Sequence, residues 1–281
     1  MTDNWKYAIR PQFTSLFVED MQERNRELGP KPKAFDTPFR YSDSGKCARA
    51  MSYSYFDYPG EEFDLPSTFV TSLGTHLHEL VQESIGRLYP EAQFEVASRC
   101  VTTSGSADAY IELDNGEKIL YELKTINGTG FKKAIGLKTR PPAISNPAGP
   151  RASAILQAAV NAKQLACDTV IIGLVSYEAI SRQTAAAAGL SEIERFIAEW
   201  EIPREVWEPI ADAEVIRQLR ILEDLDENYL SDRFVIDDNM QEVMLAPEDS
   251  RQGWQCVYCS YSQQCLKDGP GRVPVQIGEK N

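Results

Sequence analysis

One short segment constrains the fold of this chain more than any other, a predicted β-hairpin around the turn sequence Asp-Asn-Gly at residues 114–116. Runs of alternating apolar residues flank this turn, which is typical of tight hairpins. A three-residue loop there predicts a register that pairs Asp108 with Glu122 and Glu112 with Lys118. An opposite-charge pair on adjacent strands stabilises a hairpin by about 0.2 to 1 kcal/mol, so the Glu112–Lys118 pair supports this register.

The same register brings two acids and a lysine to one face of the hairpin. Side chains alternate faces along a strand, so Asp108, Glu122 and Lys124 are expected to project to the same side. Adjacent carboxylates repel unless a cation lies between them, and hard divalent cations prefer oxygen ligands. Lys124 is suited to orient an attacking water or to stabilise a charged phosphorane, with simple neutralisation of Glu122 as the alternative. We therefore predict metal-assisted hydrolysis.

The elements around the hairpin predict an α/β fold in the order helix, three antiparallel strands, helix, strand. The expected core elements are a helix over 67–88, a strand over 94–102, the hairpin over 105–126, a helix over 151–166 and a buried strand over 169–176. Outside the core we expect a helix over 13–28, a short helix over 45–55 and two acidic helices within 191–230. The chain divides into an N-terminal helical segment (1–66), the core (67–180) and an acidic helical and C-terminal region (181–281).

The distribution of charge removes an objection to a nucleic-acid partner. The net charge is −13, but residues 192–249 hold 18 acids and 5 bases, so the remainder is balanced. Residues 128–151 contain five basic residues and no acid, and we predict a mobile basic loop that contacts phosphates, with a merely solvated loop as the alternative. The candidate nucleic-acid-binding residues are Lys132, Lys133, Lys138 and Arg140.

The N-terminus lacks a basic-then-apolar signal pattern, and no apolar run approaches the roughly 18 residues of a membrane span. We therefore expect a cytoplasmic protein with no membrane partner. In that reducing compartment six cysteines are not expected to form disulfides, so clustered cysteines indicate metal or cluster ligation.

Both histidines of the chain, His76 and His78, lie in one turn of the helix that precedes the sheet. Imidazole is a good ligand for manganese or iron and is not essential for magnesium, so a histidine beside the carboxylates favours the softer divalent ions. An ordinary surface or core histidine is the alternative.

These motifs together resemble the PD-(D/E)xK nuclease superfamily in its RecB-like branch, which has a restriction-endonuclease-like core. The matching motifs are Gly74-Thr-His-Leu-His78-Glu79, Gly105-Ser-Ala-Asp108, Glu122-Leu-Lys124 and Gln157. By this resemblance His78, Asp108 and Glu122 bind the metal, Mn²⁺ or Mg²⁺, and Lys124 assists the water. Gln157 often belongs to a Gln-x-x-x-Tyr pattern in that family, whereas the fifth residue here is Asn161. Gln157, Asn161 and Gln164 still form a polar stripe at helical spacing, and His76 matches no family position.

Three cysteines cluster near the C-terminus as Cys256-x2-Cys259-x5-Cys265, and Cys47 is the best candidate for a fourth ligand. This split resembles the iron-sulfur RecB-like nucleases, including the CRISPR-associated exonuclease family and helicase-nuclease subunits. The resemblance implies a [4Fe-4S] cluster that joins the helical ends of the chain over the core. Tetrahedral zinc suits four thiolates equally well. Cys100 and Cys167 are expected to be ordinary small buried thiols.

The sequence therefore predicts a metal-dependent deoxyribonuclease with a structural [4Fe-4S] cluster. The resemblance implies an exonuclease acting on single-stranded DNA or DNA ends, although the same fold also supports endonucleases. The alternative class is a non-catalytic DNA-binding or assembly subunit of a recombination or CRISPR-adaptation complex, with zinc at the cysteines as a further possibility.

Overall fold

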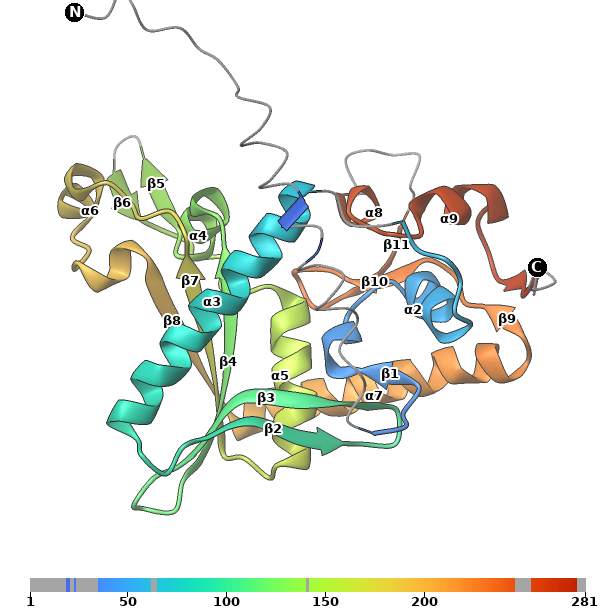
Figure 1. Cartoon of the computed structure of the whole chain (residues 1–281), viewed down its shortest axis with the longest axis horizontal. Helices are drawn as coiled ribbons and strands as arrows, with labels where there is room; N and C mark the ends of the chain where they lie inside the picture. The colour runs from blue at the N-terminus through green and yellow to red at the C-terminus, as the bar shows by residue number, and fades with distance from the viewer. Residues whose placement is uncertain are drawn as a thin grey trace, which may run out of the picture.

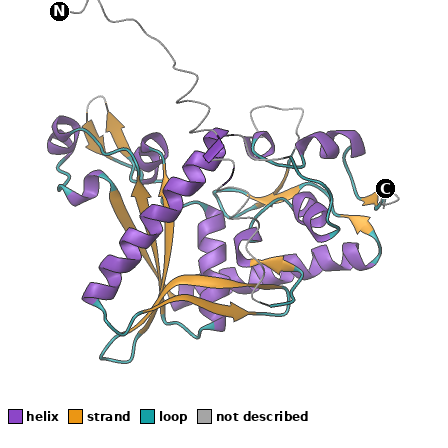
Figure 2. Ribbon diagram, in the orientation of Figure 1, coloured by secondary structure: helices purple, strands orange, loops and turns teal. Residues whose placement is uncertain are grey.

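The computed structural model describes residues 19, 20, 23, 35–61, 65–139, 142–245 and 254–276. Its centre is a six-stranded mixed sheet with helices on both faces (Figure 1, Figure 2). The sheet strands are β1 (Phe39–Arg40), β2 (Gln93–Arg99), β3 (Thr103–Glu112), β4 (Lys118–Ile126), β7 (Thr169–Ser176) and β8 (Ile197–Pro203). They are arranged in the order β1-β3-β4-β7-β8, with β2 also paired to β3.

The remaining elements surround this sheet. The helices are α2 (Ala48–Tyr55), α3 (Leu65–Leu88), α4 (Gly128–Ala134), α5 (Ala152–Gln164), α6 (Arg182–Ala188), α7 (Arg204–Asp226), α8 (Trp254–Val257) and α9 (Ser262–Asp268), with 3-10 turns η1 (Tyr41–Asp43) and η2 (Ile193–Arg195). Three two-stranded sheets are formed by β5 (Leu137–Thr139) with β6 (Pro142–Ile144), β9 (Tyr229–Leu230) with β12 (Val273–Pro274), and β10 (Phe234–Ile236) with β11 (Glu242–Met244). No helix in the described ranges is both long enough and apolar enough to cross a bilayer.

The predicted antiparallel meander is confirmed, since β2 pairs with β3 and β3 with β4. The hairpin register is also confirmed from Glu112–Lys118 to Ala109–Tyr121. The ladder ends at Ala109–Tyr121, so Asp108 and Glu122, which come next in this register, are not ladder partners. Beyond Tyr121, β4 is paired only with β7, to which it runs parallel from Ile119 to Ile126.

Helices α3 and α5 bury opposite faces of the central strands. On one face Leu77 and Val81 of α3 pack around Leu123 of β4. On the other face the alanine-rich side of α5, including the fully buried Ala158, packs around Leu120. Because alanine is small, α5 lies close to the sheet, and the middle of β4 is shielded from water on both sides.

The first of the two acidic helices predicted within 191–230 is wrong, because residues 197–203 form β8, antiparallel to β7. In this segment apolar and acidic residues alternate, which suits a strand with one buried face. Trp200 packs against the core, while Glu199 accepts a hydrogen bond of 2.7 Å from the hydroxyl of Tyr121. That tyrosine hydroxyl lies against Gly173 of the intervening strand, where any side chain would collide with it. A single helix, α7, covers most of the rest of this region.

The basic segment over 128–151 is not the plain loop that we predicted, because it contains α4 and the β5–β6 hairpin. Asn127 caps α4 by accepting the backbone N–H of Gly130 at 2.6 Å, and Phe131 is fully buried. The buried side chain of Phe131 attaches this segment to the core, although its composition, rich in Gly and Pro, predicts a loop. The predicted helix over 13–28 lies almost entirely outside the described residues.

A buried ionic network fastens the turn before α2 to α7. Glu214 and Arg217 are buried on α7 and form an ion pair of 2.8 Å. Glu214 also accepts the backbone N–H of Gly45 at 3.1 Å, and Arg217 donates to the carbonyl of Lys46 at 3.2 Å. The network therefore fixes the backbone that leads into Cys47.

Replacing Arg217 by methionine is expected to destabilise the protein by about 3 to 5 kcal/mol, because Glu214 would be left as an uncompensated buried charge. The matched control is Arg220→Met on the same helix, where the exposed pair with Glu242 is expected to contribute no more than about 1 kcal/mol. Urea denaturation measures both changes. Equal losses for the two variants would contradict the role assigned to the buried network.

Candidate active site

Glu122 is a buried carboxylate on the central strand β4, with its side chain 1% exposed. Lys124 donates to Glu122 Oε1 at 2.6 Å and to Gln157 Oε1 of α5 at 2.9 Å. The second carboxylate oxygen, Glu122 Oε2, is buried and has no hydrogen-bond partner among the described residues. A buried acceptor is costly to leave without a partner, so this oxygen requires a proton or a cation.

Asp108 lies where β3 separates from β4. Its Oδ2 accepts the backbone N–H of Leu123 at 2.7 Å, in place of a ladder hydrogen bond. Its Oδ1 lies 3.5 Å from His78 Nδ1 on α3. Helix α3 approaches the sheet closely here, because a Cβ at Gly74 would lie only 3.1 Å from Thr125 Oγ1. Gly74 and His78 are one helical turn apart, so the glycine allows the histidine to reach Asp108.

The electrostatics of this cluster favour a bound cation. Burial raises the pKa of Glu122 from 4.5 to about 7; nearby Lys124 opposes this shift and Asp108 adds to it. Burial alone would lower the pKa of Lys124, but the Glu122 carboxylate outweighs it and the pKa is raised. Lys124 is therefore a firmly charged ammonium beside Glu122, and a further positive charge nearby would favour the ionised form of the Glu122 carboxyl.

The donors present fit a divalent ion. Carboxylate oxygens from Asp108 and Glu122 are hard ligands, and the imidazole of His78 adds a softer one. Such an ion would satisfy Glu122 Oε2, which has no hydrogen-bond partner among the described residues. Among the described residues, no three His, Cys, Asp or Glu side chains are close enough together to hold one metal ion.

The structure brings five predicted residues together, and their roles stay predictions: His78, Asp108, Glu122, Lys124 and Gln157. His76 points elsewhere, since it is exposed and pairs with Glu79 at 3.2 Å. Asn161, the middle residue of the polar stripe along α5, is fully buried and accepts a hydrogen bond from Ser98 at 2.9 Å, so it does not face a substrate.

The predicted basic residues lie beyond the carboxyl end of β4. Lys132 is half-buried and Lys133 is exposed, both in the last turn of α4, and Lys138 is exposed on β5. Arg140 lies outside the described residues. Contact of these residues with phosphates stays a prediction.

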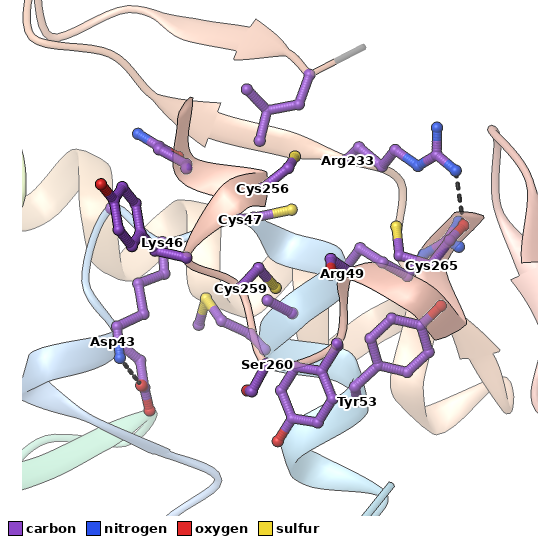
Figure 3. A pocket seen from close by; sticks show the side chains of 18 of the residues that line it. Asp43, Lys46, Cys47, Arg49, Tyr53, Arg233, Cys256, Cys259, Ser260 and Cys265 are labelled. Carbon is purple, nitrogen blue, oxygen red and sulfur yellow. Dashed lines mark hydrogen bonds and ion pairs between the residues drawn. The ribbon is translucent and has the colours of Figure 1, made fainter. Parts of the chain in front are cut away.

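The four predicted cysteine ligands line one cavity of about 640 Å³ (Figure 3). Cys47 lies at the amino end of α2, Cys256 is on α8 and Cys265 is on α9, with Cys259 in the connection between the last two helices. Burial raises the pKa of the Cys47 thiol to about 11, an effect that the backbone N–H groups of Ala50 and Arg49 partly oppose. A thiolate in this position therefore needs a compensating positive charge, which suits a metal centre.

Buried side chains attach the C-terminal cysteine segment to α2. Arg49 donates to the carbonyls of Gly269 and Gly271, and the hydroxyl of Tyr53 donates to Asp268 at 2.6 Å. Arg233 donates to the carbonyl of Cys265 at 2.7 Å. These contacts hold the two cysteine segments together across more than two hundred residues of sequence.

Sequence reasoning missed three residues at these sites, namely Arg49, Arg233 and Gln82, whose side-chain amide donates to the Asp108 carbonyl at 3.0 Å. Gln82 follows His78 by four residues, and this helical spacing was the available signal. The two arginines carry no pattern of their own, because their partners are backbone carbonyls supplied by the tertiary fold.

Comparison with known proteins supports the fold. A crystal structure of SSO0001 is 19% identical to this chain with a TM-score of 0.50, covering 91% of this chain and 97% of that one. A crystal structure of a phage-related exonuclease from Haemophilus somnus 129PT is 15% identical with a TM-score of 0.41, covering 64% and 81% of the two chains. No protein-family model and no curated protein sequence matches the chain. The likeness to SSO0001 extends over nearly all of both chains and shows a common fold.

The raised pKa of Glu122 predicts a pH dependence of stability in metal-free protein. Between about pH 4.5 and pH 7 the native state retains a proton that the unfolded state releases, so the wild type loses stability as pH rises through this window. Glu122→Gln has no such proton. We therefore compare the unfolding free energy of the variant minus that of the wild type. This difference is expected to increase by on the order of 3 kcal/mol from pH 4.5 to pH 7.

Denaturation in the presence of EDTA at several pH values measures this difference, and comparison of the two proteins cancels the titrating groups that do not interact with Glu122. A difference that does not change with pH would show that Glu122 ionises normally in the fold.

Proposed function

We propose that this protein is a metal-dependent nuclease that hydrolyses phosphodiester bonds of DNA. The observation that carries the proposal is a buried oxygen of Glu122 that has no hydrogen-bond partner in the described part of the chain and lies beside Asp108, Lys124 and His78. A purely structural ion pair would have no use for a second carboxylate and a histidine at the same point.

Asp108, Glu122 and His78 would hold the divalent ion, Mn²⁺ or Mg²⁺. When bound, this ion would supply Lewis-acid polarisation of the phosphate and acidify a water molecule. Asp108 is held for this task by the Leu123 N–H on one oxygen, with its other oxygen facing His78.

Lys124 is the candidate for contact with the attacking water or the scissile phosphate. Of its three N–H bonds, one donates to Glu122 and one to Gln157. We assign the third to the water or to the phosphate oxygen that gains charge in the transition state. Gln157 then acts through Lys124, because its carbonyl oxygen fixes the direction of the ammonium group.

DNA is the substrate that we assign, bound through the basic segment that follows β4. This segment carries Lys132, Lys133, Lys138 and Arg140. The preference for single strands or DNA ends, and exonuclease action, rest on the sequence resemblance.

We further propose that Cys47, Cys256, Cys259 and Cys265 hold a structural [4Fe-4S] cluster. All four line one cavity of about 640 Å³. The choice of a cluster over one zinc ion rests on the resemblance of the split cysteine pattern to iron-sulfur RecB-like nucleases. A cluster at this position would cross-link two distant parts of the chain and stabilise the fold.

Asp108→Ala and Glu122→Ala are expected to abolish metal-dependent cleavage of a labelled single strand while DNA binding persists. Lys124→Ala is expected to lower turnover by at least about a hundredfold, because a stabilising contact to the transition state is lost. Cleavage assays and fluorescence anisotropy measure the two properties separately.

The matched control is the histidine pair. His78→Ala is expected to reduce activity, and His76→Ala, an exposed change in the same turn, is expected to have little effect. Substantial cleavage by Glu122→Ala, or equal effects of the two histidine changes, would refute the proposed site.

Protein purified without oxygen is expected to be brown and to contain about four iron and four sulfide per chain. Cys47→Ala is expected to remove the colour as completely as Cys256→Ala, whereas Cys167→Ala, in the buried core, is expected to retain it. Elemental analysis and visible absorption check the result. Stoichiometric zinc without iron would replace the cluster by a zinc site, and colour retained in Cys47→Ala would refute the ligand set.

A further inference from the structure

The strand that carries Asp108 is interrupted at this residue. In the β2–β3 ladder Phe94 pairs with Ala109 and Val96 with Ala107, but the opposed residues Glu95 and Asp108 do not pair. On the other side, the ladder with β4 ends at Ala109. The backbone of Asp108 therefore has no ladder partner in either neighbouring strand.

Two further features mark the same interruption. Glu95 has a positive φ of 50°, a left-handed conformation that a non-glycine residue rarely adopts. Ala107 and Ala109 pack in different hydrophobic cores, although residues two apart in a regular strand share a face. Backbone strain of this kind concentrates at functional sites.

Gln82 of α3 binds the free backbone at this point. Its Nε2 donates to the main-chain carbonyl of Asp108 at 3.0 Å and lies 3.4 Å from Glu95 Oε1. Ser106 in turn donates to Glu95 Oε2 at 2.6 Å. Both groups that face the Gln82 amide only accept hydrogen bonds, so the amide must present its NH₂ group to them.

One face of α3 therefore contacts Asp108 twice. Gln82 follows His78 by four residues, so the two side chains lie on the same side of the helix. His78 faces the carboxylate of Asp108, and Gln82 binds its carbonyl. The contact through Gln82 fixes the backbone of Asp108 and, with it, the distance between Asp108 and His78.

We propose that Gln82 is a positioning residue of the metal site, and that Glu95 holds its amide in place. The proposal rests on the proposed function and deepens it, because it explains how a ligand in an interrupted strand is held for the metal. Partners that orient metal ligands without touching the metal typically change metal affinity by about 10- to 100-fold.

The test is Mn²⁺ binding to the full chain in the absence of DNA, measured by isothermal titration calorimetry. Gln82→Met keeps a similar side-chain length but cannot donate, and its Mn²⁺ affinity is expected to fall by about 10- to 100-fold. The matched control is Gln93→Met, an exposed glutamine on β2, which is expected to bind Mn²⁺ as the wild type does.

Cleavage as a function of Mn²⁺ concentration adds a readout that a merely structural role would not change. For Gln82→Met we expect activity to recover toward the wild-type kcat when Mn²⁺ is raised, because the metal ligands themselves are intact. Low activity at every Mn²⁺ concentration, together with wild-type metal affinity, would contradict the positioning role.

Glu95→Gly is a second variant that tests the same proposal even if Gln82→Met fails to fold. Glycine accepts the left-handed backbone without strain. The change removes the carboxylate that holds Gln82, and with it the hydrogen bond from Ser106. We expect a smaller loss of Mn²⁺ affinity in a protein that melts no lower than the wild type. Wild-type Mn²⁺ affinity in both Gln82→Met and Glu95→Gly would overturn the proposal.

The outcomes also separate this proposal from the nuclease assignment. Weakened Mn²⁺ binding in the variants, with no DNA cleavage by the wild type, would support the positioning role and refute the nuclease. Cleavage by the wild type, with unchanged Mn²⁺ affinity in both variants, would support the nuclease assignment and refute the positioning role. No Mn²⁺ binding by the wild type would refute both.

Discussion

The rest of the site depends on a carboxylate buried in the middle of a sheet. Glu122 lies on β4 between the apolar surfaces of α3 and α5, where water cannot solvate its charge. Lys124 partners one oxygen and leaves the other without a hydrogen bond among the described residues. This arrangement is stable only with a proton or a cation at that oxygen. The neighbouring Asp108 and His78 offer further oxygen and nitrogen donors to a divalent cation. The proposed cation would therefore both offset the cost of burying Glu122 and supply the proposed chemistry.

The surrounding architecture holds the proposed metal ligands in position by local departures from regular structure. The β3–β4 ladder stops before Asp108, and its carboxylate takes the Leu123 N–H that a ladder partner would have taken. Gly74 allows α3 close to β4, which brings His78 within reach. At the other end of the molecule, Glu214 and Arg217 fix the turn before Cys47 against α7. Both candidate centres are thus built from segments that only the tertiary fold brings together.

The features that the sequence predicts well are those set by neighbouring residues. The turn at 114–116 and the Glu112–Lys118 pair specify the hairpin, and apolar periodicity specifies α3, α5 and β7. The errors arise where contacts with distant segments of the chain determine the local structure. The acidic residues Glu199 and Glu201 suggest a solvated helix, yet pairing with β7 makes their segment a strand. The role of Gln82 depends on where α3 meets an interrupted strand, which no local pattern specifies.

The most direct test of the account is an anomalous difference map from crystals of the protein soaked in Mn²⁺, recorded at the manganese edge. We expect a single strong manganese peak bounded by Asp108, Glu122 and His78, with Glu122 Oε2 among its ligands. A well-ordered site with no manganese peak, and with Glu122 Oε2 still unpartnered or bonded to protein alone, would contradict the claim that this buried carboxylate exists to bind a metal.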